Sequence, residues 1–279
     1  MNLRAVSDAL LGEVDSKVLA RYRAVFGALL CCEAVQRLPY AVELFSSEGF
    51  HRTRFAVPVP SPTGAYALVA VSALASAAMS LGWRTRLSTL VTLLSLSWLY
   101  AIDQVSEKAL HSMSLVVLAA LAISDAGAVY SLDARREGAR AKAWVTPLRL
   151  LQLELAQVYF FAGVVKLRAP GWLDGEVLYR TMSSRWADPT GMWAVRVMPH
   201  ATWRALSVAT IVFELVGPWL LFVPRVRRYV IAAGLMFHLG IEVTLGVGWL
   251  GLHFMTALVT LFPSPEAWTR FEARVTRRG

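Results

Sequence analysis

The stretch VYFFAGVVKLRAPGW, residues 158–172, begins like an apolar membrane helix and meets a lysine, Lys166, where the apolar run ends. Extended to residues 147–167, this run approaches the roughly 20 residues that cross a bilayer core. Because similar runs recur along the chain, the sequence predicts an all-α polytopic integral membrane protein, with about eight transmembrane helices in one bundle. Lys166 itself is either an anchor that reaches water or a reactive amine.

Composition supports this fold class. The 279 residues are 56% hydrophobic and only 17% charged, which is little charge for a soluble domain of this length. The ten tryptophans suit the interfaces of a membrane. The net charge of +9 comes mostly from arginines between the apolar runs and at the ends, a pattern typical of basic cytoplasmic loops. No nucleic-acid partner is therefore expected; the bilayer is the expected partner.

Eight apolar runs organise the chain. We predict spans at about 18–36, 65–83, 87–100, 109–128, 147–167, 203–223, 229–245 and 250–261. With the N-terminus inside, the short basic loops after the second, fourth and sixth spans fall on the cytoplasmic side, as does the C-terminus. The predicted organisation is a cytoplasmic N-terminal segment (1–17), a membrane domain (18–263) and a basic C-terminal tail (264–279).

Ionisable residues inside the predicted spans are candidates for function, because a charge in lipid is costly. We single out Glu33, His111, Glu154, Lys166, Glu214, His238 and Glu242. Span order places His111, Lys166 and His238 toward the outer side, with Glu242 one helical turn from His238. The sequence predicts an outer cluster; the alternative is that the lysine reaches the headgroups and the other groups bond between helices.

The fifth span carries a polar stripe. Gln152, Tyr159 and Lys166 are seven residues apart and fall close to one face of a helix. Gly163 on the same span permits close approach of another helix or a ligand. Trp172 is predicted to anchor at the interface. The histidines lack a second histidine at metal-ligand spacing, so no metal is expected.

Three segments resemble a known family. They are LLQLELAQVYFFAGVVKLRAPGWLDGEVL (150–178), HSMSLVVLAALAISDAGAVYSLDA (111–134) and FELVGPWLLFVPRVRRYVIAAGLMFHLGIEVTLGVGWLGLHFMTALVTLFPSP (213–265). They are similar, in order and spacing, to the HTTM family, which shares the membrane domain of the vitamin K-dependent γ-glutamyl carboxylase. The most specific part is the Tyr-Phe-x-Ala-Gly-x-x-Lys-Leu run at 159–167.

The resemblance implies a chemistry. In the carboxylase a lysine deprotonates reduced vitamin K, which O₂ converts to its epoxide, and the strong base so formed removes a glutamate γ-proton before CO₂ adds. The resemblance assigns the base to Lys166, with His111 and His238 as further catalytic residues. Cofactor-binding groups would be Tyr159, Gln152, Glu242 and Trp172.

The chain also departs from the carboxylase. Val165 replaces the first of two adjacent lysines, and Leu110 and Ile241 replace asparagines near the two histidines. The carboxylase's large luminal substrate domain has no counterpart in the sequence. Carboxylation of a protein glutamate by this chain alone is therefore not expected, and a partner would have to supply the substrate.

Two functions of different classes follow. The first is a quinol-linked, lyase- or monooxygenase-type enzyme that uses reduced vitamin K or another quinol. The second is a non-enzymatic membrane protein: a small-molecule binder, a scaffold, or an immunity or maturation partner. A transporter is a weaker third candidate, because the sequence shows neither an inverted repeat nor paired broken helices.

Overall fold

A computed structural model describes residues 10–50, 53, 56–103, 109–246, 248–263 and 268. Helices dominate these residues, as the sequence predicts. The chain divides into two compact units, unit 1 up to Leu151 and unit 2 from Gln152. The division falls inside one helix, α8 (Thr146–Arg168).

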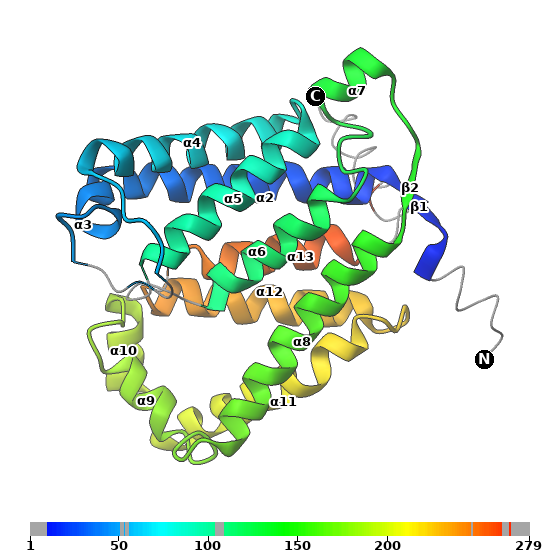
Figure 1. The fold of residues 1–279 in the computed structure, drawn as a ribbon. Helices are drawn as coiled ribbons and strands as arrows, with labels where there is room; N and C mark the ends of the chain where they lie inside the picture. The colour runs from blue at the N-terminus through cyan, green and yellow to red at the C-terminus, as the bar shows by residue number, and fades with distance from the viewer. Residues whose placement is uncertain are drawn as a thin grey trace, which may run out of the picture. The chain divides into compact units, whose positions relative to one another are not determined.

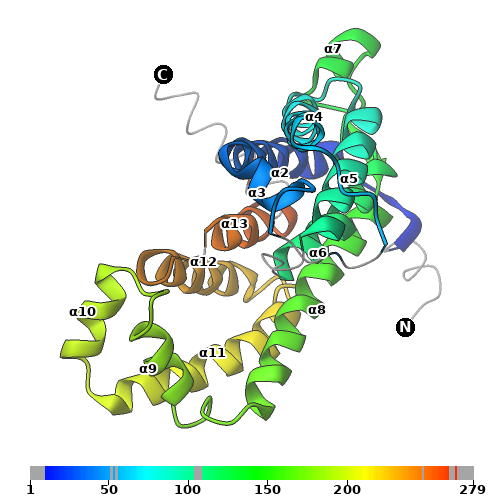
Figure 2. The same cartoon turned by 60° about the vertical axis from the view of Figure 1, so that its left-hand side comes forward.

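Unit 1 is a helical layer with one short strand pair. Its elements are β1 (Glu13–Asp15), α2 (Ser16–Arg37), η1 (Leu38–Tyr40), α3 (Ala41–Phe45), α4 (Pro62–Leu81), α5 (Thr85–Ile102), α6 (Ala109–Ala122), α7 (Leu132–Glu137), β2 (Lys142–Trp144) and the first turns of α8. Helix α4 packs against α2 on one side and α5 on the other, and α5 packs against α6 (Figures 1 and 2). The strands β1 and β2 pair antiparallel, with Val14 opposite Ala143.

The sharp turn from α4 into α5 requires glycine. Gly82 has φ +68°, and its N–H bonds to the carbonyls of Ala78 and Met79 at the end of α4. A Cβ at this position would overlap the Cβ of Ser131. Glycine is the residue that adopts this left-handed conformation at low cost. It therefore brings the ends of α4 and α5 close to the segment before α7.

Arg23 fixes this end of unit 1. The side chain is fully buried. Its guanidinium donates to four carbonyls: Nε to Ala126 at 3.1 Å, Nη1 to Met79 at 2.6 Å and Ser80 at 2.9 Å, and Nη2 to Tyr130 at 2.7 Å. One side chain of α2 thus ties the end of α4 to the chain between α6 and α7. Arg23 is not among the sequence candidates.

Asp133, in the first turn of α7, caps the start of α5. Its carboxylate accepts from the Arg84 N–H at 2.8 Å, the Thr85 N–H at 2.7 Å and the Thr85 hydroxyl at 2.6 Å. Burial alone would raise the pKa of the Asp133 carboxyl, but these hydrogen bonds hold it below its ordinary value of 3.8. The carboxylate form is therefore the one that stabilises the fold.

We expect Asp133→Asn to lower the free energy of unfolding by about 1 kcal/mol at neutral pH. Because the folded-state pKa lies below the unfolded one, the stabilisation is present above about pH 4 and is lost as pH falls through the folded-state pKa. Thermal unfolding followed from neutral pH down to about pH 3 checks this. The wild type should lose stability more steeply than the variant, and parallel curves would refute the role given to Asp133.

The described residues of unit 2 form the rest of α8 and five further helices. These are α9 (Glu176–Met182), α10 (Pro189–Val197), α11 (His200–Leu220), α12 (Arg227–Thr244) and α13 (Leu250–Leu261). Helices α12 and α13 lie side by side, while α9 packs against α10 and α11 (Figures 1 and 2). Met182, Ala194 and Trp203 form a small core there. The sequence predicts only a long connection where α9 and α10 form.

Each predicted span coincides with a helix: α2, α4, α5, α6, α8, α11, α12 and α13. The main error is at the fourth span, predicted to reach residue 128. Helix α6 ends at Ala122, because the Ser124 hydroxyl donates to the Leu121 carbonyl and accepts from the Ala126 N–H, which turns the chain. Residues 1–9 of the predicted N-terminal segment (1–17) and the predicted C-terminal tail (264–279), except residue 268, lie outside the described residues.

Four helices in the described part of the chain are long and apolar enough to cross a membrane: α4, α5, α8 and α11. Residues 111–122 of α6 and the whole of α13 are apolar but shorter. Helix α2 has sufficient length but carries Lys17, Arg21, Arg23, Glu33 and Arg37. A membrane protein is thus indicated by helix length and composition, and the number of eight spans stays a prediction.

Candidate functional site

The polar stripe of α8 bonds to three neighbouring helices of unit 2. Gln152 Nε2 donates to the Leu261 carbonyl at the end of α13, at 2.7 Å. The Tyr159 hydroxyl lies 2.5 Å from His238 Nε2 on α12. Lys166 Nζ donates to the carboxylate of a residue on α11. The seven-residue spacing predicted from the sequence is therefore one face of α8, turned toward α11, α12 and α13.

The partner of Lys166 is Glu214. Lys166 Nζ lies 2.7 Å from Oε1 and 2.8 Å from Oε2 of this carboxylate. Glu214 is only 4% exposed, while the Lys166 side chain is 21% exposed. The ammonium also lies 5.2 Å from the centre of the Trp172 ring, within the range of a cation–π contact. The amine is thus held by a buried carboxylate and an aromatic ring.

Gly163 allows α8 and α11 to approach closely enough for Lys166 and Glu214 to pair. A Cβ at Gly163 would come within 2.9 Å of the Leu215 Cγ and 3.1 Å of the Glu214 Cβ. The absence of a side chain therefore lets α8 approach α11 closely, as the sequence predicts for this glycine. Because Glu214 is buried, its charge-assisted hydrogen bonds with Lys166 act in surroundings of lower dielectric constant than water.

A second polar pair, Tyr159 and His238, lies within an aromatic cluster. The His238 ring stacks on Phe254 with 4.7 Å between centroids, and Phe213 meets Tyr159 edge-on at 5.7 Å. His238 is 3% exposed, and its Nδ1 has no hydrogen-bond partner among the described residues. A buried polar atom without a partner is unusual and marks a position where a ligand atom could bond.

We expect Tyr159→Phe to lower the free energy of unfolding by about 1–2 kcal/mol, because it removes the partner of His238 Nε2 and leaves both imidazole nitrogens buried without a hydrogen bond. Phe254→Leu is the matched control, since it removes the ring contacts with Tyr159 and His238 from the same cluster and no hydrogen bond. Thermal unfolding in detergent measures both, together with the release of any bound ligand. A Tyr159→Phe variant as stable as the wild type would show that the Tyr159–His238 bond contributes nothing.

Glu242 has its hydrogen-bond partner at the start of α13. Although it follows His238 by one helical turn, its carboxylate accepts from the Gly251 N–H at 2.8 Å. Gly251 lies in the first turn of α13, where unpaired N–H groups attract a negative charge. Glu242 therefore caps α13. Gln152 serves the opposite end of the same helix, at the Leu261 carbonyl.

His111 belongs to unit 1, whereas Lys166 and His238 belong to unit 2. It is buried on α6, stacked on Tyr100 at 4.2 Å between centroids. Its Nε2 lies 2.9 Å from Arg37 Nη2. Because a guanidinium only donates, Nε2 accepts, so the imidazole is neutral with its proton on Nδ1. The structure thus gives His111 a partner, Arg37, that sequence reasoning did not identify.

The functional candidate that sequence reasoning undervalued is Glu214. In the sequence it is one of several ionisable residues in the predicted spans, and the alternative to a catalytic role is a hydrogen bond between helices. Its partner is the lysine of the most distinctive sequence motif. The sequence could have indicated this role, because a charge buried in lipid requires an opposite charge nearby, and Lys166 and Glu214 are both in predicted spans.

An apolar groove of about 500 Å³ runs between α11 and α12. Phe213, Val216 and Gly217 line it from α11, and Tyr229 and Val230 from α12. Phe213 is shared, because its ring also meets Tyr159. Among the described residues, no three His, Cys, Asp or Glu side chains gather as a metal site.

A family model described as the HTTM domain matches residues 12–268 of the chain. No curated protein and no solved structure matches the chain. The match spans both units and includes every residue of the arrangements described above.

Proposed function

The chain belongs to the HTTM domain family, and from this premise we propose that it is a carboxylase-like membrane enzyme in which Lys166 and Glu214 move the proton of a quinol. The observation that carries the proposal is the pair itself: an amine on the family's most distinctive motif lies 2.7 Å from a buried carboxylate. The Tyr159–His238 pair lies two helical turns away along α8.

Lys166 Nζ can act as a base only after it has lost its own proton. Glu214 provides the acceptor for that proton: an N–H bond of the ammonium breaks and an O–H bond forms on the carboxylate. The pair then consists of a neutral amine and a carboxylic acid, a form that apolar surroundings favour over separated charges. The amine lone pair can take up the next proton. A reduced quinol supplies, when bound, a hydroxyl group whose proton a base can remove.

The other residues of unit 2 would hold such a molecule. His238 Nδ1 offers one hydrogen bond, and Trp172 provides a ring beside the amine. The groove between α11 and α12 offers space for an apolar tail. Because the groove is apolar, a ligand could enter it from the bilayer without passing through water. A partner protein would supply the substrate on which the reaction acts.

The orientation is part of the same proposal. Eight spans with both termini cytoplasmic place the arginine-rich connections between α4 and α5, around α7, and between α11 and α12 on the cytoplasmic side. Single cysteines introduced into these connections should react with a membrane-impermeant maleimide only after the cells are permeabilised. Labelling of intact cells at two of the three connections would contradict the orientation.

Quinone retention tests the binding proposal. We expect the protein purified in mild detergent to carry a native quinone, detected by mass spectrometry, and Lys166→Ala to reduce its content by about tenfold or more, the effect of losing one charged hydrogen bond. Lys142→Ala is the control, because Lys142 is an exposed lysine paired only weakly, at 3.7 Å, with exposed Glu13. Equal quinone content in both variants would contradict the proposal.

A non-enzymatic membrane protein is the second candidate, and a specific observation favours it. Gln152, Glu242 and His111 all have partners on neighbouring helices or helix ends, as expected of groups that only hold helices together. This function predicts a preparation without quinone and with a stably bound protein partner. The same purification distinguishes the two candidates.

A further inference from the structure

A polar pocket of about 490 Å³ lies at the end of unit 1 where α5 begins and α6 ends. Its lining includes four arginines: Arg84, Arg86, Arg136 and Arg140. One of the carboxylates in the lining, Asp133, is already engaged by the start of α5. The lining also holds Asp125 and Glu137, so its four arginines outnumber its three carboxylates by one.

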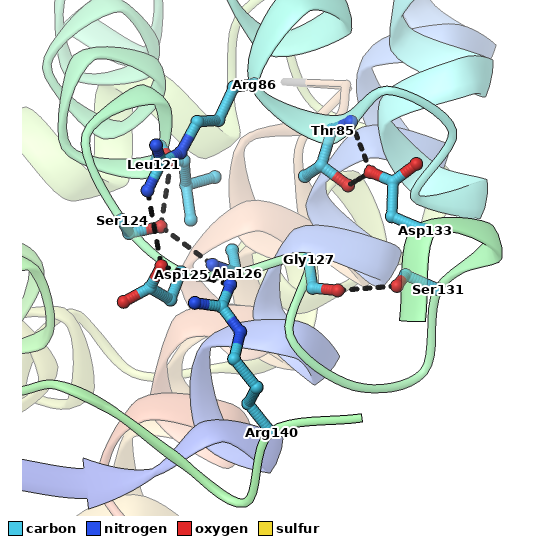
Figure 3. A network of polar contacts seen from close by, with 10 residues as sticks. All are labelled: Thr85, Arg86, Leu121, Ser124, Asp125, Ala126, Gly127, Ser131, Asp133 and Arg140. Atoms are coloured by element: carbon cyan, nitrogen blue, oxygen red, sulfur yellow. Dashed lines mark hydrogen bonds and ion pairs between the residues drawn. The ribbon is translucent and has the colours of Figure 1, made fainter. Parts of the chain in front are cut away.

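Two of the arginines converge on a single oxygen. Arg86 Nη2 lies 3.2 Å from Asp125 Oδ1, and Arg140 Nη2 lies 3.4 Å from the same atom (Figure 3). The two arginines come from segments more than fifty residues apart in the sequence. Their side chains are 67% and 66% exposed, so both remain accessible from outside. The arrangement is that of an oxyanion site in which a carboxylate from the protein occupies the anion position.

Two aromatic residues near the pocket indicate its level relative to the membrane. Trp83 and Tyr130 are both exposed. The guanidinium of Arg84 lies over the Trp83 ring, and that of Arg21 lies over the Tyr130 ring. Trp83 precedes Arg84 in the pocket wall, and α4 and α5, which meet here, are both long and apolar enough to cross a membrane. An exposed tryptophan at such a helix end, together with exposed Tyr130 in the connection between α6 and α7, is typical of the level of the lipid headgroups.

We propose that this pocket binds the phosphate of an acidic phospholipid headgroup, with Arg86 and Arg140 as its principal ligands. The phosphate oxygens would take the place of Asp125 Oδ1 between the two guanidiniums. Basic pockets at helix ends bind anionic headgroups in this way, and each arginine near the surface strengthens the binding. The site lies in unit 1 and does not depend on the chemistry proposed for Lys166.

Native mass spectrometry of the full-length protein tests the proposal, with phosphatidylglycerol and phosphatidylcholine of identical acyl chains. We expect phosphatidylglycerol to bind more tightly than phosphatidylcholine. Arg86→Gln/Arg140→Gln should weaken phosphatidylglycerol binding about 30-fold and leave phosphatidylcholine binding unchanged. Arg135→Gln/Arg225→Gln is the matched control, because it removes the same charge from exposed arginines outside this pocket.

Asp125→Asn separates lost binding from lost folding. It frees both arginines from their internal carboxylate, so we expect phosphatidylglycerol to bind about fivefold more tightly, a gain that misfolding cannot produce. If both double variants weaken binding equally and Asp125→Asn changes nothing, the pocket is not the site and the proposal fails. Displacement of the lipid by inorganic phosphate at a few millimolar would overturn the lipid assignment in favour of a free phosphate ligand.

Discussion

Replacing Lys166 by methionine should lower the free energy of unfolding by about 3 kcal/mol, because it leaves the Glu214 carboxylate buried without its cation. Glu214 is 4% exposed and both its oxygens accept from the amine. Methionine preserves most of the volume of the side chain, so the loss reports the charge rather than a cavity. Unfolding in a detergent of graded denaturing strength measures the change.

A double variant distinguishes the effect of breaking the ion pair from the effect of losing each charge. Lys166→Met/Glu214→Leu removes both charges together, and replacing a buried ion pair by apolar residues is often neutral. We therefore expect the double variant to regain most of the lost stability but to remain as deficient in quinone retention as Lys166→Met. If the single and double variants unfold alike, the carboxylate does not depend on Lys166, and the assignment of the pair is wrong.

Arg23→Met should have the largest effect in unit 1, lowering the free energy of unfolding by about 4 kcal/mol. The variant loses charge-assisted hydrogen bonds to four carbonyls, which belong to Met79, Ser80, Ala126 and Tyr130. Those carbonyls lie at helix ends and turns, where few other donors are available. The same unfolding experiment measures the loss.

Arg21→Met is the matched control for Arg23. Arg21 lies on the same helix, only half-buried, and its guanidinium stacks over the Tyr130 ring at 5.7 Å. Loss of that contact should cost about 1 kcal/mol or less. Arg23→Lys should fall between the two, because an ammonium cannot reach four carbonyls at once. Equal effects of Arg21→Met and Arg23→Met would contradict the structural role of Arg23.

Much of the fold follows from hydrophobic periodicity, because a membrane helix is specified locally by its length and apolar content. The fifth span, predicted at 147–167, forms as Thr146–Arg168, and its polar stripe lies on one face. The seven-residue spacing could be interpreted correctly because helix geometry alone sets it.

What could not be predicted depends on partners distant in the chain. Lys166 and Glu214 are 48 residues apart, and His111 and Arg37 are 74 apart. Neither pairing has a periodic signal in the sequence. The charge of Arg23 inside the predicted first span was visible in the sequence. Its role was not, since its four acceptors are backbone carbonyls, which a sequence does not distinguish from any others. The predicted end of α6 was wrong because Ser124 bonds to the backbone on both sides and turns the chain, in a segment (123–128) that also carries the charged Asp125.

The most direct test of the central claim is the conversion of a reduced naphthoquinol to its epoxide in the presence of O₂, catalysed by the purified protein in lipid nanodiscs. In this reaction one oxygen atom of O₂ enters the epoxide and the other leaves as water. We predict turnover by the wild type and by Lys142→Ala, and a loss of about 100-fold or more in Lys166→Ala, the contribution typical of a general base. Unchanged turnover in Lys166→Ala, or no epoxide from the wild type, would contradict the claim that Lys166 serves as the base.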